Sequence, residues 1–184
     1  AGNNEGVGYF EVNQKSGWRW NTAKAFLRPE CIARPNFTLW TSAQVEKLNL
    51  VTEANGQLRC TGVAVRTASG LMQAQANREV LLTAGSIGTP QLLQLSGIGP
   101  GALLQRHGVT VMHDAPGVGA NLQDHLQIRS VYKVQGVSTL NMRANSLWGK
   151  AMIGLEYPLK RSGPMSMTPS QSGAVTRSAP HQAH

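Results

Sequence analysis

Four small residues in succession, Thr83-Ala-Gly-Ser86, follow the continuously apolar run Val80-Leu-Leu82. An unbroken apolar run of this kind is typical of a short strand that is buried on both faces. A helix is then expected to begin at Thr89, because Pro90 suits the first turn of a helix and Gly97 suits the position just beyond its end. The sequence therefore predicts a buried strand that passes through a turn of small residues into a helix.

Upstream of this run, apolar and polar residues alternate with a period of two. Residues 37–51 and 58–66 are expected strands, and a third extended segment covers residues 71–82. The turn signals Glu53-Ala-Asn-Gly56 and Ala68-Ser-Gly70 leave only short connections between them. Strands joined by such short turns pair antiparallel, which predicts a three-stranded antiparallel meander. The expected fold class is α+β, composed of this meander, the buried strand and short helices.

Shorter elements are expected on either side. Asn21 is expected to cap a helix over residues 22–27, and Pro158 to end an amphipathic helix over residues 146–157. The other expected elements are short strands or ordered loop over residues 2–21, a helix from Pro100 to His107, a strand over 109–112, a loop over 116–119 and a strand over 126–134.

The charge balance bears on the choice of partner. The chain carries 17 Lys and Arg against 9 Asp and Glu, a net charge of +8, which favours an anionic partner such as a phosphate group. The basic residues nevertheless stand singly along the chain, and only 5% of residues are aromatic, so nucleic-acid binding is not expected. Cys31 and Cys60 are too few for a disulfide framework, and no apolar run is long enough to span a bilayer. We therefore expect a cytoplasmic protein with reduced thiols.

The turn at 83–86 has features of a ligand-binding turn. Small residues let a ligand approach the backbone closely, and the free amides at the start of a helix favour a phosphate group. From the spacing alone, however, a turn with nothing bound is the favoured interpretation, because many α/β proteins have such turns without a ligand. The run Gly97-Ile-Gly99 with Ala102 imitates a dinucleotide-binding fingerprint, but a helix is expected before it rather than a strand, so we reject that interpretation.

The residue pattern around this turn is more specific than its geometry. Gly85-Ser86, Thr89-Pro90, Leu92-Leu93 and Ser96-Gly97-Ile98-Gly99 resemble the second signature of the glucose–methanol–choline (GMC) oxidoreductases, and most closely the bacterial branch that is similar to choline dehydrogenases and alcohol dehydrogenases. Four further segments resemble the same family in the same order, namely residues 21–29, 116–125, 162–164 and 173–178.

This resemblance implies a flavoprotein that binds FAD and oxidises an alcohol to an aldehyde or ketone by hydride transfer to the flavin. By the same resemblance, the backbone at Val45 contacts the adenine, and Thr83, Ala84, Gly85 and Ser86 lie against the adenosine end of the cofactor. The loop that contains Asn121 lies close to the flavin-binding core. The family architecture further implies a connecting segment over 1–30, part of an α/β FAD-binding domain over 31–125, and the beginning of a substrate-binding domain over 126–184.

The sequence also departs from the family pattern. No Gly-rich fingerprint follows a first strand, and the catalytic His of the family, which lies near the C-terminus of these enzymes, has no counterpart here. We therefore expect an internal fragment without catalytic residues or a metal site, inactive alone and prone to self-association through exposed apolar surface. A non-catalytic nucleotide-binding unit and a purely structural folding unit remain as alternatives. The particular alcohol, the electron acceptor (oxygen or quinone), and whether the longer parent enzyme associates with the inner membrane stay open.

Overall fold

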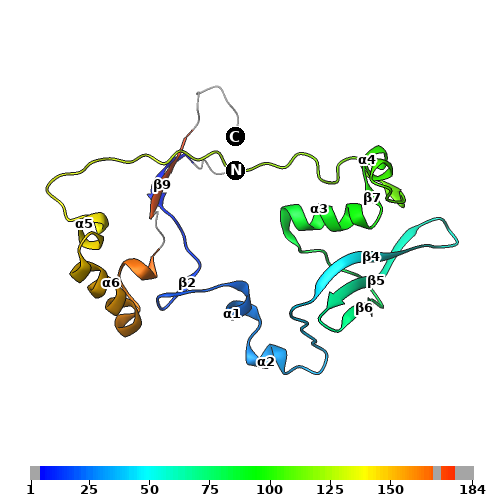
Figure 1. Ribbon diagram of the computed structural model, residues 1–184, viewed down its shortest axis with the longest axis horizontal. Coiled ribbons are helices and arrows are strands. Elements are labelled where there is room, and N and C mark those ends of the chain that lie inside the picture. The colour runs from blue at the N-terminus through cyan, green and yellow to red at the C-terminus, as the bar shows by residue number, and fades with distance from the viewer. Residues whose placement is uncertain (1–4, 168–170, 177–184) are drawn as a thin grey trace. The chain divides into compact units, whose positions relative to one another are not determined.

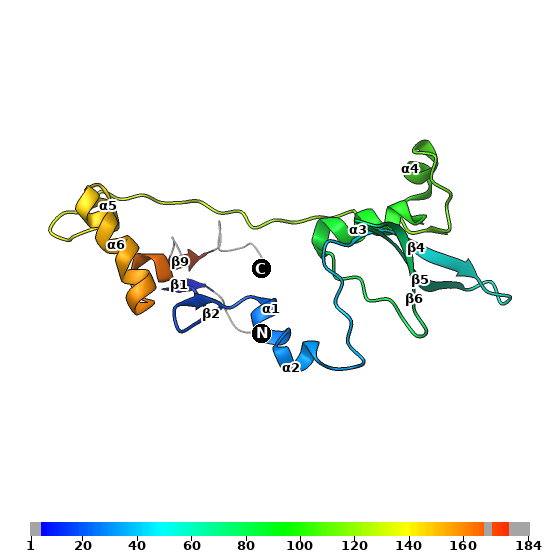
Figure 2. The same cartoon turned by 60° about the horizontal axis from the view of Figure 1, so that its bottom comes forward.

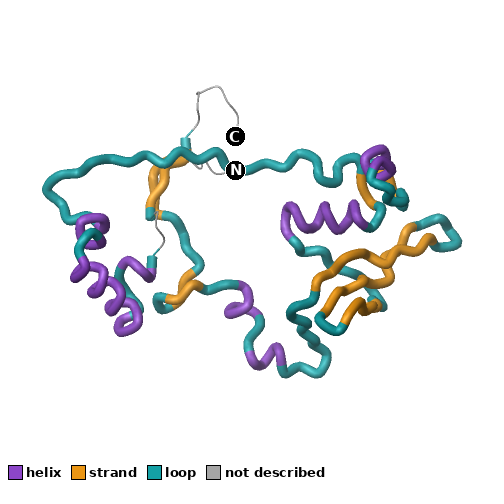
Figure 3. Tube along the Cα trace, viewed as in Figure 1, coloured by secondary structure: helices purple, strands orange, loops and turns teal. Residues whose placement is uncertain are grey.

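The computed structural model describes residues 5–167 and 171–176. It contains two compact units, which Figures 1 and 3 trace along the chain. The central unit is Leu39–Arg129, and the split unit combines Ala1–Thr38 with Ser130–His184. Among the described residues, no helix combines the length and the apolar character needed to cross a membrane.

The central unit is built on a three-stranded antiparallel sheet. Its strands are β4 (Gln44–Thr52), β5 (Leu58–Thr67) and β6 (Gly70–Gln75), and they lie in the order β4-β5-β6. The predicted meander is therefore confirmed, and the α+β fold class with it. Two register irregularities interrupt the β4–β5 pairing, one between Val45 and Lys47 and one between Asn49 and Leu50. Such bulges bend the strand locally and increase its twist.

The first predicted strand was wrong at its N-terminal end. Residues 37–43 form no strand, and β4 begins only where Gln44 pairs with Arg66. Immediately beyond this pair, β5 ends at Thr67 and the chain turns into β6. Residues before Gln44 therefore have no β5 backbone to pair with, although their alternation resembles that of a strand.

Helix α3 (Gly85–Leu95) packs against β4. It begins four residues earlier than the sequence predicted, so that Pro90 lies inside the helix rather than in its first turn. The predicted buried strand at residues 80–82 is also wrong, since these residues form no ladder and Leu81 is 76% exposed. A strand buried on both faces needs partners on both sides, and no described residue offers them to this run.

A small parallel pairing follows α3. Strand β7 (Ile98–Gly99) pairs in parallel with β8 (His113–Asp114), and helix α4 (Gly101–Arg106) lies between them in the chain. The helix predicted from Pro100 to His107 is confirmed to within one residue at each end. The strand predicted over 109–112 is displaced, because the Gly97 carbonyl accepts hydrogen bonds from the amides of Met112 and His113 and so sets the pairing further along the chain.

The buried core of the described chain lies entirely in the central unit. It comprises side chains from β4, β5, α3 and α4, namely Leu48, Ala64, Val65, Leu92 and Leu104. The one buried polar side chain among the described residues is Ser96, which is 2% exposed. This core holds α3 against the sheet, and α4 packs against β7.

In the split unit, a strand from the N-terminal part of the chain pairs with a strand from the C-terminal part. Strand β1 (Gly6–Tyr9) pairs antiparallel with β9 (Ser172–Val175). Asn21 caps α1 by accepting a hydrogen bond from the amide of Lys24, as predicted. The remaining elements are β2 (Gln14–Lys15), β3 (Trp18–Arg19), α1 (Thr22–Phe26), α2 (Pro29–Ile32), α5 (Leu140–Ala144), α6 (Leu147–Lys160) and the 3-10 turn η1 (Pro164–Ser166).

Two further expectations fail around the split unit. Residues 126–134 form no strand, because no described segment pairs with them, and their side chains are exposed. Helix α6 does not end at Pro158 but continues to Lys160, where Arg161 closes it in the left-handed conformation. The Arg161 guanidinium lies 4.2 Å from the centre of the Trp18 ring, which ties this helix end to the β2–β3 hairpin.

Candidate functional site

The predicted turn of small residues is only partly a turn, because Thr83 and Ala84 precede α3 whereas Gly85 and Ser86 are its first two residues. Thr83, Ala84, Gly85 and Ser86 are all exposed. Gly85 has φ +84°, and an added Cβ at this position would meet no atom within 4 Å. The backbone here is therefore open to a ligand, as a turn of small residues predicts.

The start of α3 has no side-chain cap of the usual kind. Ala84 occupies the N-cap position, and its own amide donates to Thr89 Oγ1 at 3.1 Å. The amides of the first helical turn have no intrahelical acceptor, and the helix dipole gives this end a partial positive charge. An anionic group is favoured at such an exposed helix start.

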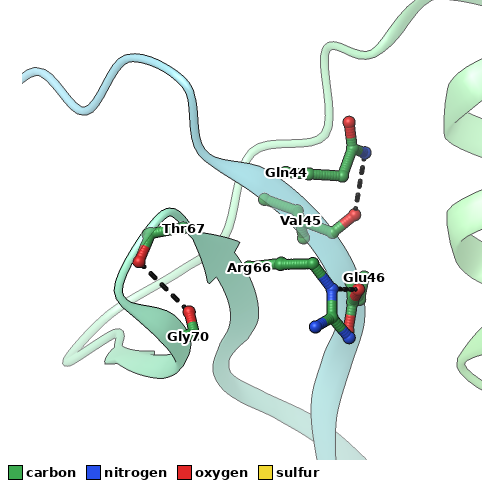
Figure 4. Close-up of polar contacts among 6 residues, drawn as sticks. All are labelled: Gln44, Val45, Glu46, Arg66, Thr67 and Gly70. Carbon is green, nitrogen blue, oxygen red and sulfur yellow. Dashed lines mark hydrogen bonds and ion pairs between the residues drawn. The ribbon is translucent and has the colours of Figure 1, made fainter.

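Val45 lies near the start of β4, at the free edge of the sheet. Because the strand order is β4-β5-β6, β4 has a sheet partner on one side only. Figure 4 shows the Val45 carbonyl accepting a hydrogen bond from the Gln44 side-chain amide, with Nε2 and O 3.1 Å apart. The Val45 carbonyl is therefore held by the Gln44 side chain at the start of the edge strand.

Val45 and the 83–86 turn lie at the same end of the central unit. Both views of the chain show α3 and β4 beginning on the side away from the hairpin tip between β4 and β5 (Figures 1 and 2). The buried hydrogen bond from the Leu48 amide to Ser96 Oγ fixes the opposite end of α3 against the middle of β4. Two of the segments expected to contact the cofactor are therefore brought to one end of the unit by the helix–strand packing.

An ion pair lies next to Val45. Glu46 binds Arg66 through Nε and also through Nη2, the latter at 3.1 Å, and this pair crosses from β4 to β5 (Figure 4). The hydrogen bond that Arg66 donates to Glu46, together with the negative charge of Glu46, raises the pKa of Arg66 above its ordinary value. The two charges offset each other, so the strand start presents little net charge to a ligand.

Asn121 follows the loop at residues 116–119, which the sequence predicted as a loop. It is exposed and has φ +56°, in the left-handed region that Asn tolerates better than most residues. The preceding Gly119 lies against α3, since a Cβ placed on it would be 2.8 Å from Gln94 Nε2 and 3.8 Å from Pro90 Cβ. The loop therefore contacts α3 shortly before it reaches Asn121.

The second half of the signature motif has a packing role. Ser96 Oγ accepts from the Leu48 amide at 2.8 Å and donates to the Leu92 carbonyl at 2.6 Å. A Cβ on Gly97 would lie 2.5 Å from the Thr110 carbonyl oxygen, and one on Gly99 would lie 2.9 Å from Gln94 Cγ. The run Ser96 to Gly99 therefore lets α3, β4 and the segment at Thr110 approach one another closely. A helix, α3, precedes this run, as expected, and this agrees with rejecting Gly97-Ile-Gly99 as a dinucleotide-binding fingerprint.

Sequence reasoning missed two polar side chains around α3. Gln94 donates from Nε2 to the Val118 carbonyl at 3.0 Å, and Asp114 Oδ1 accepts from the Gly101 amide at 2.8 Å. Gln94 could have been singled out from the sequence, because it is a polar residue between the apolar positions Leu93 and Leu95. The pairing of β7 with β8, which places Asp114 beside the start of α4, could not be inferred from the pattern.

The histidines show no catalytic arrangement in the described part of the chain. The Asp124 carboxylate accepts a hydrogen bond from the backbone amide of His125 rather than from its ring. His107 occupies the C-cap of α4, as predicted. His181 and His184 lie outside the described residues. Within residues 5–167 and 171–176, no group of three His, Cys, Asp or Glu side chains could hold a metal ion.

Comparison with known proteins gives a consistent result. The sequence profile of the GMC oxidoreductases matches residues 1–127. An alcohol dehydrogenase [acceptor] of Pseudomonas putida is 36% identical over 181 residues, which cover 97% of this chain and 32% of the relative. An oxygen-dependent choline dehydrogenase of Photobacterium profundum is 38% identical over 174 residues, covering 95% of this chain and 29% of the relative.

Solved structures agree with the sequence relatives. An FAD-dependent oxidoreductase from Chaetomium thermophilum superposes with a TM-score of 0.73 and 28% identity, covering 91% of this chain and 29% of that protein. The chain thus spans about a third of the length of the relatives that it matches.

Proposed function

Since the chain belongs to the GMC oxidoreductase family, we propose that it forms part of the FAD site of an enzyme that oxidises alcohols to aldehydes or ketones. The observation that carries this proposal is the shared position of Val45 and the open Thr83–Ser86 turn at one end of the central unit. The resemblance in sequence covers nearly the whole chain, and the relatives named above are dehydrogenases of alcohols and choline.

The residues present fit the adenosine half of FAD. Adenine has an amino group that donates and ring nitrogens that accept, and β4, the edge strand that contains Val45, has backbone groups along the side that no other strand of the sheet pairs with. The exposed start of α3 favours a phosphate group, and Gly85 leaves space for one. When bound, FAD supplies the group that takes hydride from the substrate carbon.

In this proposal each segment has a separate task. Val45 orients the base, Thr83, Ala84, Gly85 and Ser86 receive the ribose and phosphate groups, and Asn121 holds the loop next to the cofactor. None of these residues transfers a proton or an electron. The chain therefore binds and orients the cofactor, and the chemistry belongs to the flavin and to residues of the longer parent enzyme.

We further propose the domain division expected from the sequence. Residues 1–30 connect, residues 31–125 belong to the FAD-binding domain, and residues 126–184 begin the substrate-binding domain. The compact central unit, Leu39–Arg129, supports the second of these assignments because it contains every proposed cofactor contact. Whether the parent enzyme associates with the inner membrane depends on its electron acceptor, oxygen or a membrane quinone, and both alternatives stay open.

Titration of FAD with the purified chain tests the proposal. Bound flavin changes its fluorescence, and ADP competes if the adenosine half carries the affinity. Ser86→Phe places a large side chain on the exposed first turn of α3 and should weaken binding at least 10-fold. Gln91→Phe is the matched control, because Gln91 is also exposed on α3 but lies beyond the first turn.

Three outcomes separate the candidate functions. Saturable binding that ADP displaces and Ser86→Phe weakens supports the proposed cofactor site. Equal weakening by Gln91→Phe contradicts the site at the helix start. A chain that binds neither FAD nor ADP favours a purely structural unit instead.

A further inference from the structure

The loop between β8 and Asn121 is attached to α3 at one place by a side chain. Gln94, half-buried near the end of α3, donates from Nε2 to the Val118 carbonyl at 3.0 Å. The loop has its own internal turns, in which the Val118 amide donates to the Ala115 carbonyl and the Ala120 amide to the Gly117 carbonyl. The Gln94 contact is therefore what fixes this turn structure to the helix.

Two glycines make room for this contact. A Cβ on Gly99 would lie 2.9 Å from Gln94 Cγ, and a Cβ on Gly119 would lie 2.8 Å from Gln94 Nε2. Gly119 also has φ +81°, a conformation that a residue with a side chain rarely adopts. The Gln94 side chain is thus enclosed by the backbone on two sides, which restricts its rotamers and gives the hydrogen bond a defined direction.

The direction of the loop follows from its contacts along α3. Gln94 and Pro90 are one helical turn apart, and both lie next to the Gly119 position. The Val118 carbonyl is held at Gln94, and the Gly119 position also lies beside Pro90, one turn nearer the N-terminal end of α3. Asn121 comes two residues after Gly119, on the segment that these contacts hold to α3.

We propose that Gln94 is a positioning residue that lays the 116–121 segment along α3 and so delivers Asn121 to the cofactor-binding end of the helix. This inference rests on the proposed function, because it assigns Gln94 a role toward the cofactor through Asn121. Gln94 itself does not touch the cofactor. Its effect is to couple the loop to the helix whose start receives the phosphate groups.

The first test measures the loop itself. Gln94→Met keeps the length of the side chain and removes the donor, whereas Gln91→Met makes the same change at an exposed site on the same helix. Hydrogen exchange at the Val118 and Ala120 amides should accelerate about 3- to 10-fold in Gln94→Met, as expected when one neutral hydrogen bond is lost. Exchange at the Leu48 amide, which Ser96 holds, should not change in either variant.

The second test measures coupling to the cofactor by a double-mutant cycle. Asn121→Ala should weaken FAD binding about 5-fold in the otherwise unchanged chain and have no further effect in the Gln94→Met background. A purely structural role for Gln94 would lower affinity without abolishing the effect of Asn121→Ala.

The outcomes distinguish this inference from the proposed function. If FAD binds, but Asn121→Ala retains its full effect in the Gln94→Met background, the role of Gln94 is overturned and the cofactor site stands. Unchanged exchange at Val118 and Ala120 in Gln94→Met also overturns it. If the unchanged chain binds neither FAD nor ADP, the proposed function fails, and the cofactor role of Gln94 fails with it.

Discussion

Ser96 connects the signature motif to the sheet at the scale of a single residue. Its hydroxyl is buried, accepts from the Leu48 amide and donates to the Leu92 carbonyl, so both its hydrogen-bonding functions are used. A buried amide that loses its acceptor keeps the full cost of its desolvation. The serine of the motif is therefore explained by the backbone group that it satisfies on β4.

Replacing this hydroxyl should destabilise the chain. Ser96→Ala leaves the Leu48 amide buried without its acceptor and should lower the free energy of unfolding by about 1–3 kcal/mol. Ser86→Ala changes an exposed serine on the same helix and should stay within about 0.5 kcal/mol. Urea unfolding monitored by circular dichroism measures both, and equal small effects would contradict the assigned role of Ser96.

A comparison of Gly97 with Gly108 separates two costs of adding a side chain: the strain of the left-handed backbone conformation and the clash with a neighbouring segment. Both have positive φ, but a Cβ at Gly97 meets the Thr110 carbonyl at 2.5 Å, whereas one at Gly108 meets nothing within 4 Å. Gly108→Ala should therefore cost only the left-handed conformation, about 1–2 kcal/mol. Gly97→Ala should cost at least about 1 kcal/mol more, because a backbone segment must also move. Thermal unfolding of the two variants gives this difference, and a ranking in the opposite order would refute the packing explanation.

At the scale of helices and strands, the sequence predicted the elements that have local signals and failed where an element needs a partner from elsewhere in the chain. Turn residues and alternation identified β5 and the meander, and Asn21 identified the start of α1, because these signals are local. The strands predicted at 80–82 and 126–134 failed because strand formation needs a partner, and a run of apolar residues does not specify one. Of the candidate site, the small residues at 83–86 next to a helix were predictable, but the Gln94 and Asp114 contacts depend on tertiary pairing.

Asp114 joins two elements, since it belongs to β8 and accepts from the first amide of α4. Asp114→Ala should destabilise α4 and its pairing by about 0.5–2 kcal/mol, the usual cost of losing a helix cap. Asp124→Ala removes a carboxylate that binds only the neighbouring amide in an exposed loop, and it should have little effect. Helix-resolved hydrogen exchange at Leu104 and His107 would reveal the loss, and unchanged protection there would argue against the capping role.

At the scale of the whole molecule, a long exposed segment, residues 126–134, begins in the central unit and continues into the split unit. Apolar side chains along it are almost fully accessible, namely Leu126 (96%), Ile128 (86%), Val131 (92%) and Tyr132 (80%). Exposed apolar side chains gathered in one segment favour contact with another surface. We therefore expect the isolated chain to self-associate through this segment.

Sedimentation velocity over a range of concentrations tests this expectation. The sedimentation coefficient should rise with concentration, and Ile128→Ser with Val131→Ser should reduce the rise. Leu147→Ser is a control of similar exposure, since Leu147 is 86% exposed outside the segment. A monomer at every concentration would rule out this association.

The most direct measurement of the central claim is amide chemical-shift mapping of the ¹⁵N-labelled chain on addition of ADP. The cofactor site proposed here predicts that the shifts concentrate at Val45 and at Thr83–Ser86, with smaller changes near Asn121. Shifts that instead cluster in the split unit, or no shifts at saturating ADP, would contradict the assignment of this end of the central unit to the cofactor.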